Sequence, residues 1–494
     1  MDSAPPIDDS ARPIPPRHWW ARRVGAVVAL CLLAFGGLNY GQSCRIEQRL
    51  ADRVAAIRAL GEPILADDFA ADHVSPDEDA APLLLRAAAG IVASVPHPAT
   101  APADAPDMDD AEPGAYVVAS RTWTPNLSDC CSDRALVRER LDDVAFLLRE
   151  NGPALELLDQ VCERPRADWR IRLTSPMLNV RLPYLTPVRH LARLAGTRAM
   201  YASETGDHAT TVRSISQTLT LTNYLSERPA HFITALVAIA VQTVTASVIE
   251  QTAHDLDVGD APPAADRGDV QALIAALLDE RAIRRALREG LYTERAMQLD
   301  ATRGIADGTF PGLAAAPLLS TPMRWLFRPM TLSAGVRLID YTTAYAIAIE
   351  AESYPAVRSR VPEPPDEGAD MLGLVSQLLP SYDRGTRLFY RSLAERRMAS
   401  VALAIRLYVV DHGVRPATLE ALVPDYLPFV PRDPFAADDR PLGYLPEADP
   451  PRLYSVGENE TDEGGAYMLR GNRGRAWGAY DIPFFLDRPP ADTE

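Results

Sequence analysis

The sequence predicts a mainly α-helical protein with an N-terminal transmembrane helix, a domain of antiparallel helical hairpins and a small C-terminal α+β domain. Three observations lead to this fold class. An uncharged apolar run occupies residues 24–40, apolar residues return every three or four positions from about residue 45 to 377, and short strand-like runs follow residue 440. With 494 residues, 47% of them hydrophobic, the chain is long enough for several folded units.

The charge excludes some classes of protein. The net charge is −17, from 67 acidic and 50 basic residues, and every basic residue is Arg. Residues 1–23 hold three Asp and four Arg, a sum of +1, which leaves −18 for the remainder. A chain without Lys cannot form a Walker A loop, and an acidic body is a poor partner for phosphates. We therefore expect no nucleic-acid partner.

The first element is a membrane anchor at residues 24–40. At 1.5 Å per residue this helix spans about 26 Å, near the thickness of the hydrocarbon core, and Trp19 and Trp20 stand at the place of an interfacial belt. A small excess of Arg before the run favours a cytoplasmic N-terminus, so residues 1–23 are expected to be a disordered cytoplasmic tail. A cleaved signal peptide is the alternative, because the run is also close to the length of a signal h-region.

Cysteine usage fits a body outside the cytoplasm. Cys31 lies in the apolar run, and the others are Cys44, Cys130, Cys131 and Cys162. These four could form two disulfides with any of three connectivities, or remain small buried thiols. The sequence leaves both alternatives open.

Residues 44–380 are predicted to form the α-helical extracytoplasmic domain, with a Pro- and Asp-rich linker near residues 95–128. A helical hairpin is clearest near the middle. An apolar stripe from Val188 to Ala202 ends at Gly206, and Asp207 follows as the expected N-cap of the next helix. Turns this short indicate that successive helices are antiparallel neighbours.

The segment at residues 232–249 has two interpretations. It is uncharged and long enough to span a membrane. Its polar side chains make it less apolar than the anchor; they are Thr234, Gln242, Thr243, Thr245 and Ser247. Because of this polarity, and because Arg-Pro precedes the segment, we favour a buried central helix. The alternative, a second span, would return the C-terminal third to the cytoplasm.

The C-terminal domain is predicted at residues 381–486. A long amphipathic helix at residues 383–411 ends before Gly413, a helix stop signal. Strand-like runs follow at residues 442–445 and 453–456, separated by a turn that contains Pro and Asp.

A series of short motifs covers this domain in order. They include Asp411-His412-Gly413, Leu419-Glu420-Ala421-Leu422-Val423-Pro424, Pro431-Arg432-Asp433-Pro434-Phe435 and Tyr454-Ser455-Val456-Gly457. In this order they resemble the globular head of the major pseudopilin of type II secretion systems, a protein G-like domain. The resemblance extends over residues 385–483, and residues 487–494 are expected to form a tail. The prepilin N-terminus of that family is absent, so the resemblance implies a shared head fold without assembly into a pseudopilus.

The resemblance also implies a calcium site, because pseudopilin heads of this type bind calcium in the loop after the Ser-x-Gly motif. Carried over residue by residue, the ligands are Ser455, Asn459, Asp462 and Asp481. Carboxylate and amide oxygens are the ligands that calcium prefers. This chain has Asn459-Glu460 where the family has Asp-Gly, and a solvated acidic turn is the alternative.

Two short motifs characterise the rest of the chain. They are Gly61-Glu62-Pro63 and the stretch from Asp79 to Pro82. Together with the anchor and the C-terminal domain, they make the chain similar to membrane-anchored bacterial envelope proteins without assigned function. This similarity implies a location in the envelope and no particular activity.

Residues suited to catalysis are scattered. Four histidines could converge inside the helical domain, although none are spaced i, i+4 as in a helix-borne metal pair; they are His190, His208, His231 and His254. Glu294 and Asp300 are a candidate acid–base pair among many carboxylates.

The sequence therefore predicts a binding or scaffolding protein of the bacterial cell envelope, without catalytic activity. It would cross the inner membrane once, keep its body on the extracytoplasmic side, and have envelope proteins as partners and calcium in its C-terminal loop. Two alternatives stay open: an anchored extracytoplasmic hydrolase with a site among the helices, and an accessory factor of a type II secretion-like system.

Overall fold

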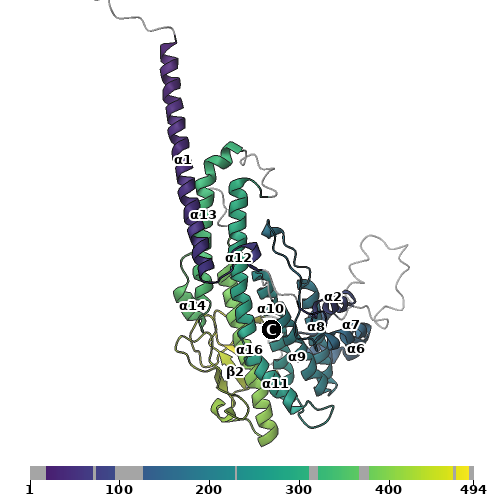
Figure 1. The fold of residues 1–494 in the computed structure, drawn as a ribbon. Helices are drawn as coiled ribbons and strands as arrows, with labels where there is room; N and C mark the ends of the chain where they lie inside the picture. Colours follow the sequence, from purple (N-terminus) through teal and green to yellow (C-terminus); the bar gives the residue numbers. More distant parts are fainter. Residues whose placement is uncertain are drawn as a thin grey trace, which may run out of the picture.

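A long projecting helix, a helical bundle and a small sheet make up the fold (Figure 1). The computed structural model describes residues 18–69, 74–94, 126–227, 231–310, 321–365, 378–470 and 474–488. Within them the chain is mainly α-helical, as predicted. Most of the predicted tail at residues 1–23 and of the predicted linker near residues 95–128 lies outside the described residues, as does most of the tail at residues 487–494.

Helices precede all of the strands along the chain. The helices are α1 (Trp19–Ala59), η1 (Ala66–Phe69), α2 (Ala81–Ala89), α4 (Leu127–Cys130), α5 (Arg134–Glu139), α6 (Leu141–Glu150), α7 (Gly152–Val161), η3 (Met177–Asn179), α8 (Leu185–Glu204), α9 (His208–Leu225), α10 (Phe232–Thr252), η4 (Ala253–Asp255), α11 (Arg267–Leu278), α12 (Arg281–Asp307), α13 (Thr321–Ala348), α14 (Tyr354–Arg360), α16 (Tyr382–His412) and η8 (Leu419–Leu422). The strands are β1 (Gly443–Leu445), β2 (Arg452–Ser455), β3 (Leu469–Arg470), β4 (Gly474–Arg475) and β5 (Ile482–Phe485).

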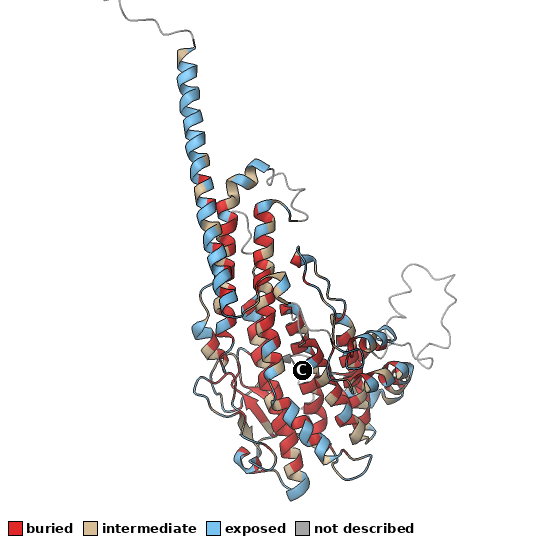
Figure 2. Cartoon of the chain, viewed as in Figure 1, coloured by how far each residue is buried: buried red, intermediate tan, exposed pale blue. Residues whose placement is uncertain are grey.

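Helix α1 divides into an exposed half and a packed half. The first half projects beyond the rest of the molecule and is exposed on all sides (Figure 2). Val27, Val28 and Leu33 point to different sides of the helix and are 60%, 51% and 74% exposed. Leu50 and Ile57 in the second half are buried against α12 and α13. By length and composition, α1 could cross a membrane.

The turn predicted between α8 and α9 is confirmed. Gly206 has a φ of +79°, a backbone conformation that favours glycine, and Asp207 caps α9 by accepting the N–H of Thr210 over 3.0 Å. The two helices pack against each other as antiparallel neighbours.

Helix α10 occupies the centre of the bundle, in contact with α8, α9, α12 and α16. Two of its buried threonines have partners: Thr245 shares a hydrogen bond of 2.6 Å with Thr218, and Thr234 one of 3.2 Å with Tyr184. Paired hydroxyls avoid most of the cost of burying polar groups. Residues 232–249 thus take the position that we predicted for a buried central helix.

Helix α16 joins the bundle to the C-terminal strands. It ends at Gly413, whose φ is +73°, as predicted. Arg396, buried in its middle, donates to the carbonyl groups of Leu277 and Asp279 at the C-terminal end of α11. A cation at this end also complements the helix dipole.

The sheet has the order β1-β2-β5 and is antiparallel, and β3 pairs with β4. The strands predicted at residues 442–445 and 453–456 are confirmed to within a residue, whereas β3, β4 and β5 were not predicted. A single hydrophobic core contains Leu453 of β2, Leu403 of α16 and Val241 of α10. Because this core crosses residue 381, the division into domains at residues 44–380 and 381–486 stays a prediction.

The packing of α12 on α10 predicts the effect of a small substitution at Gly290. A Cβ atom added there would lie 2.8 Å from the Cα atom of Phe232, so the backbone of α10 would have to shift. We expect Gly290→Ala to lower the free energy of unfolding by about 1–2 kcal/mol, because overpacking outweighs the gain in helix propensity. Urea unfolding in detergent measures this change in the free energy of unfolding.

Gly152→Ala is the matched control, since a Cβ atom on Gly152 would meet nothing within 4 Å. Its effect should stay within about 0.5 kcal/mol. Equal stability of the two variants would contradict this account of the packing.

Candidate functional site

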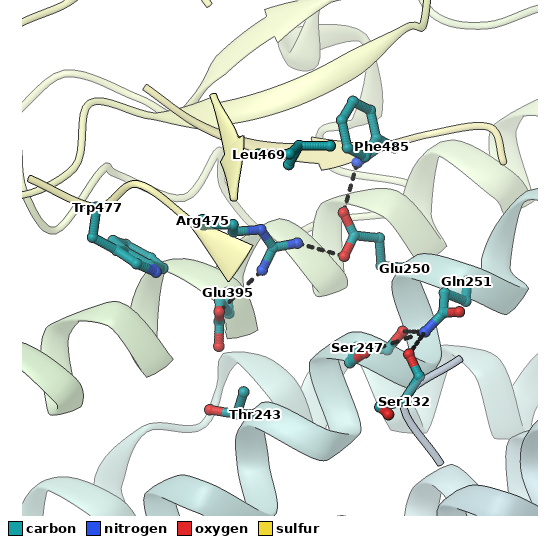
Figure 3. Close-up of a pocket in the computed structure, with 10 residues that line it drawn as sticks. All are labelled: Ser132, Thr243, Ser247, Glu250, Gln251, Glu395, Leu469, Arg475, Trp477 and Phe485. Atoms are coloured by element: carbon teal, nitrogen blue, oxygen red, sulfur yellow. Dashed lines mark hydrogen bonds and ion pairs between the residues drawn. The ribbon is translucent and has the colours of Figure 1, made fainter. Parts of the chain in front are cut away.

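A pocket of about 260 Å³ lies where the C-terminal strands meet α10 and α16 (Figure 3). Segments far apart in the sequence line it: Ser132, Thr243, Ser247, Glu250, Gln251, Glu395, Leu469, Arg475, Trp477 and Phe485. This lining offers hydroxyl, amide and charged groups. Among the described residues its lining contains neither His nor Cys, so these residues do not assemble a nucleophile with a histidine base.

Arg475 lies between two buried glutamates at one side of this pocket. Its guanidinium donates to Glu250 on α10 and, over 3.1 Å, to Glu395 on α16. Glu250 also accepts the N–H of Phe485 in β5 over 3.0 Å. Glu250 and Glu395 are only 8% and 6% exposed. One guanidinium therefore connects two helices of the bundle to the C-terminal strands.

Arg475, Glu250 and Glu395 form a triad, and the charge of each group depends on the presence of the other two. Burial raises the pKa of Glu395, and the charge of Arg475 opposes that rise. Burial alone would lower the pKa of Arg475, but the carboxylates of Glu250 and Glu395 outweigh it and raise this pKa. With all three groups ionised the triad carries one negative charge.

Sequence reasoning missed all three residues of the triad. The one available signal is the position of Glu250, which is the first charged residue after the uncharged segment at residues 232–249. A carboxylate at the end of a buried helix needs a partner. The identity of that partner depends on how distant segments pack, so the sequence does not give it.

Among the predicted calcium ligands, Ser455 is turned into the core. Its hydroxyl donates to Asp433 over 2.7 Å. Asp433 also accepts the N–H groups of Val456 and Phe435, over 2.7 and 3.0 Å, and burial raises its pKa. Asp433 belongs to the Pro-Arg-Asp-Pro-Phe motif and holds the start of the loop in place.

The other predicted ligands lie together around Glu463. Asn459 donates to its carboxylate over 2.7 Å, and Asp481 accepts its N–H over 3.1 Å. Asp481 is 1% exposed, and among the described residues neither its Oδ1 atom nor Oε2 of Glu463 has a hydrogen-bond partner. Burial, reinforced by the charges of Glu463 and Asp462, raises the pKa of Asp481 to about 7.

This loop brings Asn459, Glu463 and Asp481 into contact with one another. A buried carboxylate oxygen without a partner is a group that a cation would satisfy, and calcium accepts carboxylate, amide and backbone carbonyl oxygens. In the part of the chain that the structure describes, no group of three or more His, Cys, Asp or Glu side chains is arranged to hold a metal ion. Asp462 is engaged by Arg440 over 2.6 Å.

The histidines named from the sequence lie in different surroundings. His231 is buried at the start of α10, where burial lowers its pKa to about 4. His254 lies 3.9 Å from Asp255, but Arg134 binds that carboxylate through two N–H groups at 2.7 and 3.0 Å. Asp255 is thus held in an ion pair and is not available to orient a catalytic histidine.

Glu294 and Asp300 do not form an acid–base pair. They stand six positions apart on α12, on different faces of the helix. Asp300 accepts the N–H of Met177 over 2.8 Å. Burial raises the pKa of Glu294 to about 7.

All five cysteines lie in described residues and are free thiols. The structure thus contains no disulfide, and the alternative of small unpaired thiols is the one it realises. Burial raises the pKa of Cys130, Cys131 and Cys162 to about 12, which makes them poor nucleophiles at neutral pH.

No protein-family model, curated protein or solved structure matches this chain. The similarity of its C-terminal part to pseudopilin heads therefore stays a prediction from the motifs.

Removing the cation of the triad should destabilise the protein strongly. Arg475→Met leaves two buried carboxylates without a counter-charge, and we expect a loss of about 3–5 kcal/mol in the free energy of unfolding. Replacing Glu250 and Glu395 by Gln in the same variant should restore part of that loss. Chemical unfolding measures both.

Arg281→Met is the control, because Arg281 forms an exposed ion pair with Asp279 over 2.6 Å. Such pairs contribute less than about 1 kcal/mol. A loss in Arg475→Met no larger than in this control would contradict a structural role of the triad.

Proposed function

We propose that this chain is a membrane-anchored binding or scaffolding protein of the bacterial cell envelope that acts without catalysis. Residues 24–40 would cross the inner membrane, with the N-terminus in the cytoplasm and the body on the extracytoplasmic side. The observation that carries the proposal is α1, one continuous helix of 41 residues that is apolar and exposed in its first half and packed in its second.

The contacts of α1 favour a rigid tether. Arg53 forms an ion pair with Asp340 of α13 over 3.0 Å, and Glu47 pairs with Arg328 of the same helix. A body joined to its anchor without a flexible linker stays at a fixed height above the bilayer. That arrangement suits a protein that presents surfaces to partners in the envelope.

The proposal includes a calcium ion in the C-terminal loop. Asp481, Glu463 and Asp462 would hold it with the amide oxygen of Asn459 and backbone carbonyl groups. The orphaned oxygens of Asp481 and Glu463 support this assignment, as do the motifs shared with pseudopilin heads. When bound, calcium would neutralise the clustered carboxylates and stiffen the loop. Ser455 would act indirectly, through its bond to Asp433.

Charges placed in the exposed half of α1 test the anchor. Each Arg at the centre of a membrane helix costs about 3 kcal/mol of insertion free energy, so Leu32→Arg/Leu33→Arg should release the protein from membranes. The measurement is the fraction that remains in the membrane pellet after alkaline carbonate extraction.

The control is Leu60→Arg/Leu85→Arg, which alters two residues that are 72% and 40% exposed outside the proposed span. This variant should stay in the pellet. Equal extraction of the two variants would refute the anchor.

The calcium site predicts a pH-dependent stability. The raised pKa of Asp481, about 7 against about 3.9 unfolded, stabilises the calcium-free protein at low pH, and this contribution is lost as the pH rises through about 7. Calcium binds the ionised form, so it should raise the melting temperature more at about pH 8 than at about pH 6.

Two single variants are compared, Asp481→Asn and Asp425→Asn. In the unaltered protein the carboxylate of Asp425 is exposed elsewhere in the C-terminal part. Only Asp481→Asn should abolish the calcium effect. The same melting temperature in calcium and in chelator for the unaltered protein would count against the site.

A further inference from the structure

Helices α1 and α13 run side by side in the same direction, and their polarity changes together along their length. Phe35 of α1 meets Trp325 of α13 with ring centroids 6.4 Å apart. One turn on, the amide of Asn39 donates to the carbonyl of Leu326 over 2.9 Å.

The first ion pairs between these helices come farther along. Arg328 of α13 pairs with Glu47 of α1 and with Asp307 at the end of α12. From Phe35 to Glu47 the distance along the helix is about 18 Å. Between these positions the contacts of α1 with α13 therefore change from aromatic to ionised.

The start of α13 presents an exposed apolar surface at the level of the anchor. Trp325 is 42% exposed and Met330 is 38% exposed, and Met323 before them and Phe327 between them are partly exposed. Phe35 lies five residues, or about 7 Å, inside the end of the apolar run at Tyr40. If residues 24–40 lie in the bilayer, Trp325 lies at the depth where tryptophan is enriched in membrane proteins.

Two further features fit the same position. These turns carry two charged side chains, and both are engaged. Arg324 donates to the carbonyl of Gly308 at the end of α12 and to Thr321. Arg328 pairs with Glu47 and Asp307. Pro329 interrupts α13, and the turns before it bend away from α1 (Figure 1). A bent end with engaged polar groups can rest in the membrane interface.

We infer that the start of α13, with Trp325 and Met330 on its surface, inserts into the extracytoplasmic interface of the bilayer that α1 crosses. The occupant of this apolar surface is lipid, because the surface is continuous with the lipid-facing half of α1. The inference rests on the proposed anchor. It adds a second membrane contact that fixes the orientation of the body as well as its height.

Quenching by brominated lipids tests this contact. The full chain is reconstituted in phosphatidylcholine nanodiscs with and without brominated acyl chains, and tryptophan emission is compared with that of Trp325→Phe. The difference in emission between the unaltered protein and this variant comes from Trp325, and the brominated lipids should quench it. Trp20→Phe and Trp477→Phe are the references: Trp20 precedes the anchor, and Trp477 is 8% exposed in the C-terminal part.

The references separate the two proposals. If the lipids quench Trp20 but quench Trp325 no more than Trp477, the inference is overturned and the anchor stays intact. If they do not quench Trp20, the anchor itself is overturned. Met330→Trp gives a second measurement that keeps Trp325. Its added emission should be quenched less than that of Trp325 and more than that of Trp477, and quenching no greater than that of Trp477 would contradict the inserted surface.

Discussion

The burial of α10 is the constraint on which the rest of the structure depends. A helix that is uncharged from Phe232 to Ile249 must be largely covered or lie in a membrane. In this fold α8, α9, α12 and α16 cover most of it, and Ile233 is left 53% exposed. The covering helices come close because small residues face its start. Gly290 of α12 and Gly385 of α16 both lie against Phe232, at distances that a larger side chain would not allow.

The end of α10 sets the position of the C-terminal strands. Glu250 follows the uncharged segment and remains buried, so it requires a counter-charge and hydrogen-bond donors. Arg475 and the N–H of Phe485 supply them. The same helix thus organises the bundle through its apolar length and the sheet through its charged end.

Local features could be predicted from the sequence, and contacts between distant segments could not. The stop at Gly206, the cap at Asp207 and the end of α16 at Gly413 depend on neighbouring residues, and all three are confirmed. The triad combines residues 80 to 225 positions apart, so no spacing in the sequence marks it. In the proposed calcium loop, the motifs indicated Asp481, but they did not indicate that Ser455 bonds to Asp433.

The central claim is that α1 alone crosses the membrane and that α10 belongs to the extracytoplasmic core. Two reporters fused after Glu494, one active only outside the cytoplasm and one active only within it, test this claim most directly. With a single span and a cytoplasmic N-terminus, only the reporter that requires export should be active. Activity of the cytoplasmic reporter at this position would contradict the account, because α10 would then be a second span.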